Sequence, residues 1–403
     1  MSHATVSRPT VSYKEHFSRF FAAAPGRLHF AAHSHHLWPD VTYDAQVACW
    51  QDAARLADRK WDTVFGEVLP ETQRRIAEVL GLSDPASLAF APNTHDFLRR
   101  LLSCLPPARS ARILCSDGEF HSFTRQVARL EEDGLVEVTR APVEPFADFA
   151  ERFVETAARG TPAGGFDMIY VSQVFFNSGF AIDPLDSVVD RLPAEDALLV
   201  IDGYHGFLAR PTDLSAIEGR AFYLSGGYKY AMAGEGVCFL HAPPGLGLRP
   251  RDTGWYAAFG ALEQPGGGEV AYAADGGRFL GATFDPVGLY RQRAVLVWLA
   301  ELGLTAAGIY DHVRGLQQLF LEALEWKAPS CLPLRALLLD PRHEPCGNFL
   351  TFDLGEAAAG ALQGRLLDLD VITDYRGARL RFGFGLYQDA EDVERLVDRL
   401  AGF

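Results

Sequence analysis

The segment ALLVIDGYHGF, residues 197–207, places five apolar residues directly before Asp202. Such a run, closed by a glycine, is typical of a strand buried on both faces, so we expect Asp202 at the strand's carboxyl end. A carboxylate there is costly unless it faces a cation. The alternative is that Asp202 caps the following turn, and this residue taken alone leaves both interpretations open.

Similar apolar runs occur on both sides of this segment. Six more strands are predicted, in LAFAP (88–92), RILCS (112–116), VEVTRAP (136–142), FDMIYVSQV (166–174), AFYLSGG (221–227) and GVCFLHAP (236–243). Helical patterns lie between several of them, for example at 120–134 and 146–160. The alternation predicts an α/β fold with a mostly parallel sheet, helices on both faces and ligands beyond the carboxyl ends of the strands.

The pattern changes at a glycine-rich stretch, residues 264–279, which is followed by two long helical segments and a short αβ unit. We therefore expect three parts: an N-terminal arm with an active-site loop (1–50), a large cofactor-binding domain (51–275) and a small C-terminal domain (276–403).

The composition narrows the class of protein. The 403 residues carry a net charge of −15, which argues against nucleic acid or an anionic membrane as the main partner. Six cysteines without a CxxC pair, no apolar leader and no apolar run of bilayer length predict a cytoplasmic protein without disulfides. The histidines of HSHH (33–36) lack further ligands at suitable spacing, so no metal site is expected.

The segment LSGGYKYAMAGEG, residues 224–236, places Lys229 among small and aromatic residues just after a predicted strand. A crowded apolar site lowers the pKa of a lysine, and the uncharged amine attacks carbonyls. The alternative is a surface lysine on a turn. Asp202 and Lys229 together favour pyridoxal phosphate, which offers an aldehyde to the amine and a protonated ring nitrogen to the carboxylate.

Two further segments suit such a cofactor. Asn93, Thr94 and His95 begin a predicted helix, whose free amides form an anion site, although capping of the helix is the simpler role. Phe120, just after another strand, could stack on a flat ring or belong to the core.

With these residues in place, the sequence resembles the fold type I pyridoxal-phosphate enzymes of the class V aminotransferase group, and within it the kynureninases. The resemblance runs from about residue 29 to the end. It rests on four motifs: DGYH (202–205), GGYKYAMAGEG (226–236), GWYAAFG (254–260) and LRFGFGLYQDAEDV (380–393). It implies the aspartate aminotransferase fold and a homodimer with shared active sites.

The resemblance also implies roles for individual residues. Lys229 would form the covalent link to the cofactor and move protons, with Tyr228 as a proton donor. Asp202 would contact the pyridine nitrogen, His205 the polar edge of the ring, and Phe120 would stack on the ring. The phosphate would be bound by Asn93, Thr94, His95 and Tyr228. Trp255 is a further implied cofactor contact, and Thr283 would reach the neighbouring subunit's site.

The substrate side carries the remaining expectations. Arg381 matches the arginine that binds the substrate carboxylate, but Arg379 lies on the same face of the predicted strand and is a rival. His33 and Ser34 replace an Asn-Ser turn of the family, and Asp285 replaces an asparagine that recognises an aromatic amino ketone. Because a carboxylate repels a carbonyl, we expect weak activity on kynurenine and a better substrate with a polar or cationic group.

The expected activity is a kynureninase-like hydrolysis of the Cβ–Cγ bond of an amino acid. The alternative is a class V aminotransferase, or a cysteine desulfurase or lyase, on the same cofactor. A desulfurase needs a mobile nucleophilic cysteine, for which Cys346 is the candidate.

Overall fold

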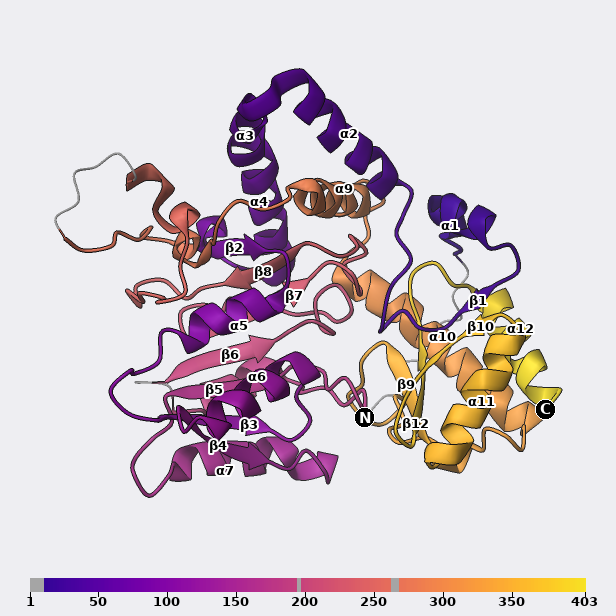
Figure 1. Cartoon of the computed structure of the whole chain (residues 1–403). Helices are drawn as coiled ribbons and strands as arrows, with labels where there is room; N and C mark the ends of the chain where they lie inside the picture. Colours follow the sequence, from indigo (N-terminus) through magenta and orange to yellow (C-terminus); the bar gives the residue numbers. More distant parts are fainter. Residues whose placement is uncertain (1–10, 194–196, 262–267) are drawn as a thin grey trace.

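The computed structural model describes residues 11–193, 197–261 and 268–403 (Figure 1). Its centre is a seven-stranded sheet in the order β2-β8-β7-β6-β5-β3-β4. The strands are β2 (Leu88–Ala91), β3 (Ala111–Ser116), β4 (Val136–Ala141), β5 (Met168–Ser172), β6 (Leu198–Asp202), β7 (Ala221–Gly226) and β8 (Cys238–His241). In this sheet, β8 runs in the direction opposite to the other six strands. All seven predicted strands are present, and the mostly parallel sheet is confirmed.

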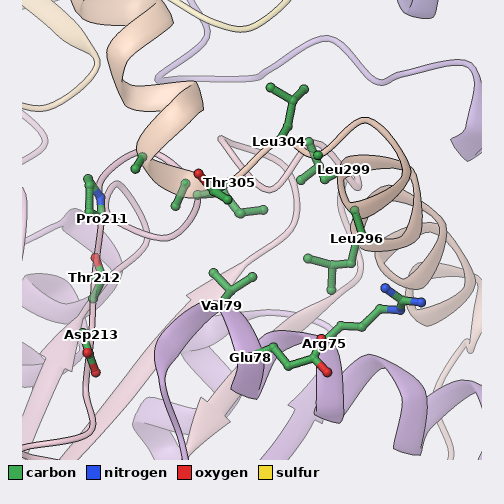
Figure 2. A pocket seen from close by; sticks show the side chains of 15 residues that line it. Arg75, Glu78, Val79, Pro211, Thr212, Asp213, Leu296, Leu299, Leu304 and Thr305 are labelled. Atoms are coloured by element: carbon green, nitrogen blue, oxygen red, sulfur yellow. The ribbon is translucent and has the colours of Figure 1, made fainter.

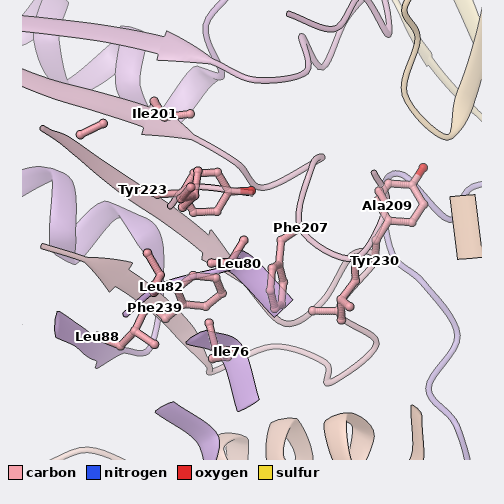
Figure 3. Close-up of a cluster of buried hydrophobic side chains, with 14 of the residues drawn as sticks. Ile76, Leu80, Leu82, Leu88, Ile201, Phe207, Ala209, Tyr223, Tyr230 and Phe239 are labelled. Atoms are coloured by element: carbon pink, nitrogen blue, oxygen red, sulfur yellow. The ribbon is translucent and has the colours of Figure 1, made fainter. Parts of the chain in front are cut away.

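The sheet is buried on both faces, as its continuous apolar runs require. Along β6, Leu199 and Ile201 belong to one hydrophobic core and Val200 to the other. Helices α5 (Thr94–Leu102) and α6 (His121–Glu132) cover the second face. The first face is covered by α4 (Leu69–Leu80), α7 (Phe149–Arg159) and α8 (Leu185–Asp190). Figure 3 shows part of the first core, where Ile76 and Leu80 of α4 meet Tyr223 and Phe239 of the sheet.

The remaining helices frame the sheet and form the small unit. They are α1 (Ser18–Ala23), α2 (Val41–Leu56), α3 (Lys60–Thr63), α9 (Val287–Glu301), α10 (Ala306–Lys327), α11 (Glu356–Asp368) and α12 (Ala390–Ala401). Residues Leu289 and Val295 of α9 pack into the core of the large sheet, whereas Val313 and Phe320 of α10 pack into a separate core. The division proposed at residue 275 stays a prediction, but the small unit's own core begins within α10.

The small unit contains an antiparallel sheet in the order β11-β12-β9, with β9 (Phe349–Asp353), β11 (Asp374–Arg376) and β12 (Arg379–Gly383). Residues 371–376 of this unit contain two short strands. The first, β10 (Val371–Ile372), pairs in parallel with β1 (Leu28–His29) of the N-terminal arm, and only the second joins β12. The pairing of β1 with β10 anchors the N-terminal arm to the small unit. Figure 1 also shows that the carboxyl end of β6 points toward the small unit.

Within the described residues, no single helix is long and apolar enough to cross a membrane. Helices α9 and α10 meet that criterion only as a pair, bent by 81° at their junction.

A prediction concerns the turn that follows Asp202. A Cβ atom on Gly203 would lie 1.9 Å from Cζ of Tyr223, a fully buried side chain. We expect Gly203→Ala to reduce the free energy of unfolding by about 1–3 kcal/mol through overpacking. The midpoint of thermal unfolding measures this. Gly219→Ala is the matched control, because a Cβ there meets open space. Equal midpoints for the two variants would show that the turn after β6 is not tightly packed.

Candidate active site

A cavity of about 410 Å³ lies at the carboxyl ends of the parallel strands. Eight of the residues singled out from the sequence line it: Asn93, Thr94, His95, Phe120, Asp202, His205, Tyr228 and Lys229. They come from separate segments spread over residues 93–229, so the fold brings the predicted cofactor residues together. What each can do depends on its burial and its partners.

Lys229 follows β7 and is 5% exposed. Its Nζ lies 4.7 Å from the ring centroid of Tyr204, 5.1 Å from that of Phe120 and 5.6 Å from that of Tyr228. Among the described residues Lys229 makes no ion pair. Burial lowers the pKa of Lys229 to about 7, although the charge of Asp202 opposes the shift. A large share of Lys229 is therefore a free amine at neutral pH, the form that attacks an aldehyde or removes a proton.

Asp202 lies at the end of β6, as predicted, and its carboxylate has two donors. Oδ1 accepts the backbone N–H of Tyr204 at 2.9 Å, and Oδ2 accepts the hydroxyl of Tyr170 at 2.9 Å. Burial raises the pKa of Asp202, and the positive charge of Lys229 partly offsets the rise. The two interpretations of Asp202 are thus compatible, since it stabilises its turn and presents a carboxylate that a cationic ring nitrogen would keep ionised.

Helix α5 begins in the wall of the same cavity. The side chain of Asn93 caps it by accepting the backbone N–H of Asp96 at 2.9 Å. Thr94 and His95 form its first turn, where the helix dipole and the free amides favour an anion. Nδ1 of His95 is buried without a hydrogen-bond partner. An unsatisfied buried nitrogen beside a helix N-terminus fits a phosphate group, so the residues present suit the predicted cofactor.

The N-terminal loop with HSHH packs against this cavity. The backbone N–H of His36 donates to the carbonyl of Tyr228 at 3.0 Å, and Nε2 of His205 donates to the carbonyl of His33 at 3.2 Å. Burial lowers the pKa of His205 and of His33 well below the usual value, so both rings are neutral. Ser34 lies outside the cavity, with its hydroxyl 3.3 Å from Nδ1 of His35.

The two candidate arginines differ in depth. Arg381 is 3% exposed, and its Nη1 donates to the carbonyl of Phe176, whose side chain lines the cavity. Arg379 is 18% exposed and pairs with Glu144 at 2.5 Å. The charge of Arg381 also contributes to the lowered pKa of Lys229. Arg381 is therefore the arginine beside the site, although its contact with a substrate stays a prediction.

Like His33, Ser34 and Arg381, three more predicted residues are not among those that line the cavity of their own chain. Asp285 is exposed and accepts the backbone N–H of Val287 at 3.0 Å, which stabilises the first turn of α9. Trp255 is 44% exposed and stacks on Tyr256 at 4.2 Å between ring centroids. Thr283 is exposed near Tyr256. The expectation that Asp285 repels a substrate carbonyl is thus not met within one chain.

Several supporting residues were missed. Tyr204 lies inside the DGYH motif and could have been found from its position. Ser172 and Glu119 had no distinguishing pattern, yet the fully buried carboxyl of Glu119 accepts the hydroxyls of Ser116 and Ser172, each at 2.5 Å. Burial raises the pKa of Glu119 to about 7. Gly227, where the family often has serine, has no space for a side chain, because a Cβ would lie 2.6 Å from the carbonyl of Gly234.

A larger cavity, of about 590 Å³, lies between α4, α9 and the start of α10 (Figure 2). Its walls are mainly apolar, with Arg75, Glu78 and Asp213 among the charged residues that line it. None of the predicted site residues lies there. Among the residues that the structure describes, no group of three or more His, Cys, Asp or Glu side chains could hold a metal ion.

Comparison with known proteins identifies the family of the chain. Residues 49–335 match the family described as aminotransferase class-V. Isopenicillin N epimerase of Streptomyces clavuligerus is 29% identical over 383 residues, covering 86% of this chain and 88% of that protein. A probable cysteine desulfurase of Vibrio cholerae is 23% identical over 224 residues, or 53% of each chain.

The fold also matches solved structures. A cystine C–S lyase in complex with cysteine persulfide superposes with a TM-score of 0.77 at 20% identity, over 95% of this chain and 99% of that one. The predicted fold is therefore confirmed. None of these three relatives is a kynureninase.

The shifted pKa of Lys229 generates a prediction. Protein freed of cofactor should form a borohydride-trappable link with pyridoxal phosphate at Lys229, at a rate that rises with pH through about 7 and then levels off. The rise follows because the free amine reacts, whereas a lysine of ordinary pKa is only about 0.03% uncharged at pH 7. Peptide mapping identifies the labelled residue, and Lys229→Ala is the control. Labelling elsewhere, or a rate still rising at pH 10, would contradict the assignment.

Proposed function

The chain belongs to the class V aminotransferase family, and from this premise we propose that it labilises the Cα–H bond of an α-amino acid. It is a pyridoxal-phosphate-dependent enzyme, as predicted. When bound, the cofactor supplies an electron sink for charge that develops at Cα. One observation carries the proposal: the amine of Lys229, with a pKa near 7, lines the same cavity as the buried carboxylate of Asp202.

Different residues of the chain would bind the cofactor and move the proton. Asp202 would keep the ring nitrogen charged, Phe120 would stack on the ring, and the first turn of α5 at Thr94 and His95 would hold the phosphate. Lys229 would then take the proton from Cα of a substrate whose carboxylate binds near Arg381. The aromatic rings around Lys229 exclude water and keep the amine uncharged, which suits a general base.

Among the outcomes of this first step, we favour delivery of a proton to the face of Cα opposite the one that lost it, which is epimerisation. Of the two sequence relatives named above, the one matched over the longer stretch is named isopenicillin N epimerase. A cysteine desulfurase has less support, because Cys346 is 2% exposed and burial raises the pKa of its thiol to about 12. Cys238, in the cavity wall, has its pKa raised to about 12 in the same way. Neither is a mobile thiolate.

Kynureninase-like cleavage of Cβ–Cγ is the second candidate. The motifs DGYH and GGYKYAMAGEG support it. The relatives named above support a desulfurase, lyase or epimerase better, and Asp285 lies outside the cavity of its own chain. A C–S lyase also fits the cavity, since it needs the same first step and no cysteine nucleophile from the protein.

The decisive experiment incubates the holoenzyme with α-amino acids in D₂O. We expect proton NMR to show loss of the Cα–H signal and chiral chromatography to show the opposite enantiomer. The same mixtures are assayed for keto acid, sulfide and, with kynurenine, anthranilate. Asp202→Asn should retain cofactor absorbance yet slow exchange by about a hundredfold, because an amide does not stabilise the protonated ring. Near-native exchange in this variant, or anthranilate as the main product, would contradict the proposal.

We also propose that the working unit is a homodimer. The exposed side chains of Trp255 and Phe259 lie in the same part of the chain surface as Tyr256, which contacts both Trp255 and Phe284. Exposed aromatic side chains of this kind are enriched at protein interfaces. A partner covering them would come close to Thr283, whose predicted role is in the neighbouring subunit's site.

Co-expression tests the shared site. Lys229→Ala and Thr283→Glu are expected to be inactive as separate proteins, the second because its carboxylate would repel the phosphate. If Thr283 serves the neighbour, a mixed dimer contains one intact site, so activity should reappear. Light scattering gives the mass of the active species. No recovery in mixed dimers, or full activity in a monomer, would contradict the proposal.

A further inference from the structure

Arg381 is held by an acidic residue built into the same hairpin. In the register of β11 and β12, Asp374 lies directly opposite Arg381. Its Oδ2 accepts a hydrogen bond from Nη2 of Arg381, and its Oδ1 accepts one from Nη1 of Arg376 at 2.9 Å. Asp374 is 13% exposed and Arg381 3%, so their contact is largely removed from water, whereas Arg376 is half-exposed. Cross-strand pairs of this kind are fixed by the backbone ladder.

The guanidinium of Arg381 is anchored at two points, and its Nε–H takes part in neither contact. Nη1 donates to the carbonyl of Phe176 at 2.5 Å, while Nη2 is held by Asp374. Nε is buried and has no hydrogen-bond partner. Buried donors are almost always paired in folded proteins, so an orphaned Nε beside the cavity points to a ligand. Nδ1 and Nε2 of His33 are also buried without partners, and Nε2 lies 3.8 Å from Oδ2 of Asp374.

The charges of this cluster suit one carboxylate. Arg376 and Arg381 contribute two positive charges and Asp374 one negative charge, which leaves a net charge of about +1 because the ring of His33 is neutral. A single bound carboxylate would neutralise the cluster. Without Asp374 the same cluster would carry about two positive charges.

We propose that Asp374 is a positioning residue for substrate recognition. It fixes the plane of Arg381 so that Nε remains for the substrate carboxylate, and it limits the site to one negative group. The inference rests on the proposed function, since it assumes an amino acid whose carboxylate binds Arg381. It adds that the affinity and charge selectivity of this site depend on an acidic residue that need not touch the substrate.

The test measures dissociation constants from the change in cofactor absorbance when the holoenzyme is titrated with L-asparagine and L-aspartate. We expect Asp374→Ala to bind L-asparagine about tenfold more weakly, because the guanidinium loses one of its two anchors. Asp374→Asn should restore binding to within about threefold of wild type, since its amide oxygen accepts the same hydrogen bond. Turnover at saturation should change less than KM for whichever amino acid proves to be a substrate.

The effect of the negative charge of Asp374 on ligand selectivity is measured separately with the Asp374→Asn variant. Asp374→Asn removes the negative charge, so its affinity for L-aspartate relative to L-asparagine should rise about fivefold. This measurement does not depend on the stability of the Ala variant. The matched control is Glu144→Gln, which removes the partner of Arg379 two residues along the same strand and should change neither ligand's affinity.

Each outcome decides between the ideas. If Asp374→Ala and Asp374→Asn bind both ligands as wild type does, the role of Asp374 is overturned while the proposed function stands. If Glu144→Gln weakens binding as much as Asp374→Ala, the effect belongs to the strand and not to Asp374, and the inference is also overturned. If no amino acid alters the cofactor absorbance of the wild-type holoenzyme, the proposed function fails and this inference fails with it.

Discussion

The site depends on an amine and a carboxyl group, of opposite charge when both are ionised, that are buried in one cavity without touching. Lys229 and Asp202 influence each other's pKa, yet they form no direct ion pair. Separated charges in a dry interior are costly, because each loses hydration and neither gains the full attraction of a contact. The fold maintains the separation by placing them after adjacent parallel strands, β6 and β7, whose carboxyl ends share one edge of the sheet. A flat cofactor with a carbonyl at one side and a basic nitrogen at the other satisfies both charges at once.

The strands of the large sheet and the positions of Asp202 and Lys229 could be predicted from the sequence, because they follow from local sequence patterns. Each strand of the large sheet is buried on both faces, so it appears as an unbroken apolar run, and a polar residue that closes such a run is placed at the sheet edge. That logic located Asp202 and Lys229. It could not divide residues 371–376, where two short strands pair with different partners. The choice of partner is a tertiary property, since either segment has a suitable strand composition.

The positions of Arg379, Arg381 and Asp285 relative to the site could not be predicted from the sequence, because they too depend on tertiary contacts. Alternation put Arg379 and Arg381 on one face, but depth separates them: the surface residue Glu144 pairs with the first, and the carbonyl of Phe176 with the second. Asp285 precedes Pro286 at the start of α9, and its carboxylate binds the helix's first turn. A family resemblance can align such a residue with a substrate contact. It does not reveal which subunit's cavity the residue would reach.

The larger cavity is connected to the site through the loop that follows Asp202 and His205, because Leu208 and Thr212 of this loop line that cavity. Thr212 lines that cavity and accepts a hydrogen bond from Gln173 at 2.9 Å (Figure 2). The amide oxygen of Gln173 in turn accepts the hydroxyl of Tyr223 at 3.0 Å, and that hydroxyl lies 3.4 Å from the carbonyl of Gly203.

This chain of contacts leaves no space around the turn. A Cβ atom on Gly206 would lie 1.8 Å from the amide oxygen of Gln173, so this position of the turn after β6, like Gly203, has no space for a side chain. The backbone that positions Asp202 is therefore fixed from behind by neutral hydrogen bonds, while its carboxylate faces the cavity. Size alone would favour the larger cavity as the site. The loop thus has neutral hydrogen bonds on the side of the larger cavity and presents Asp202 and His205 to the smaller one, where we propose that the chemistry takes place.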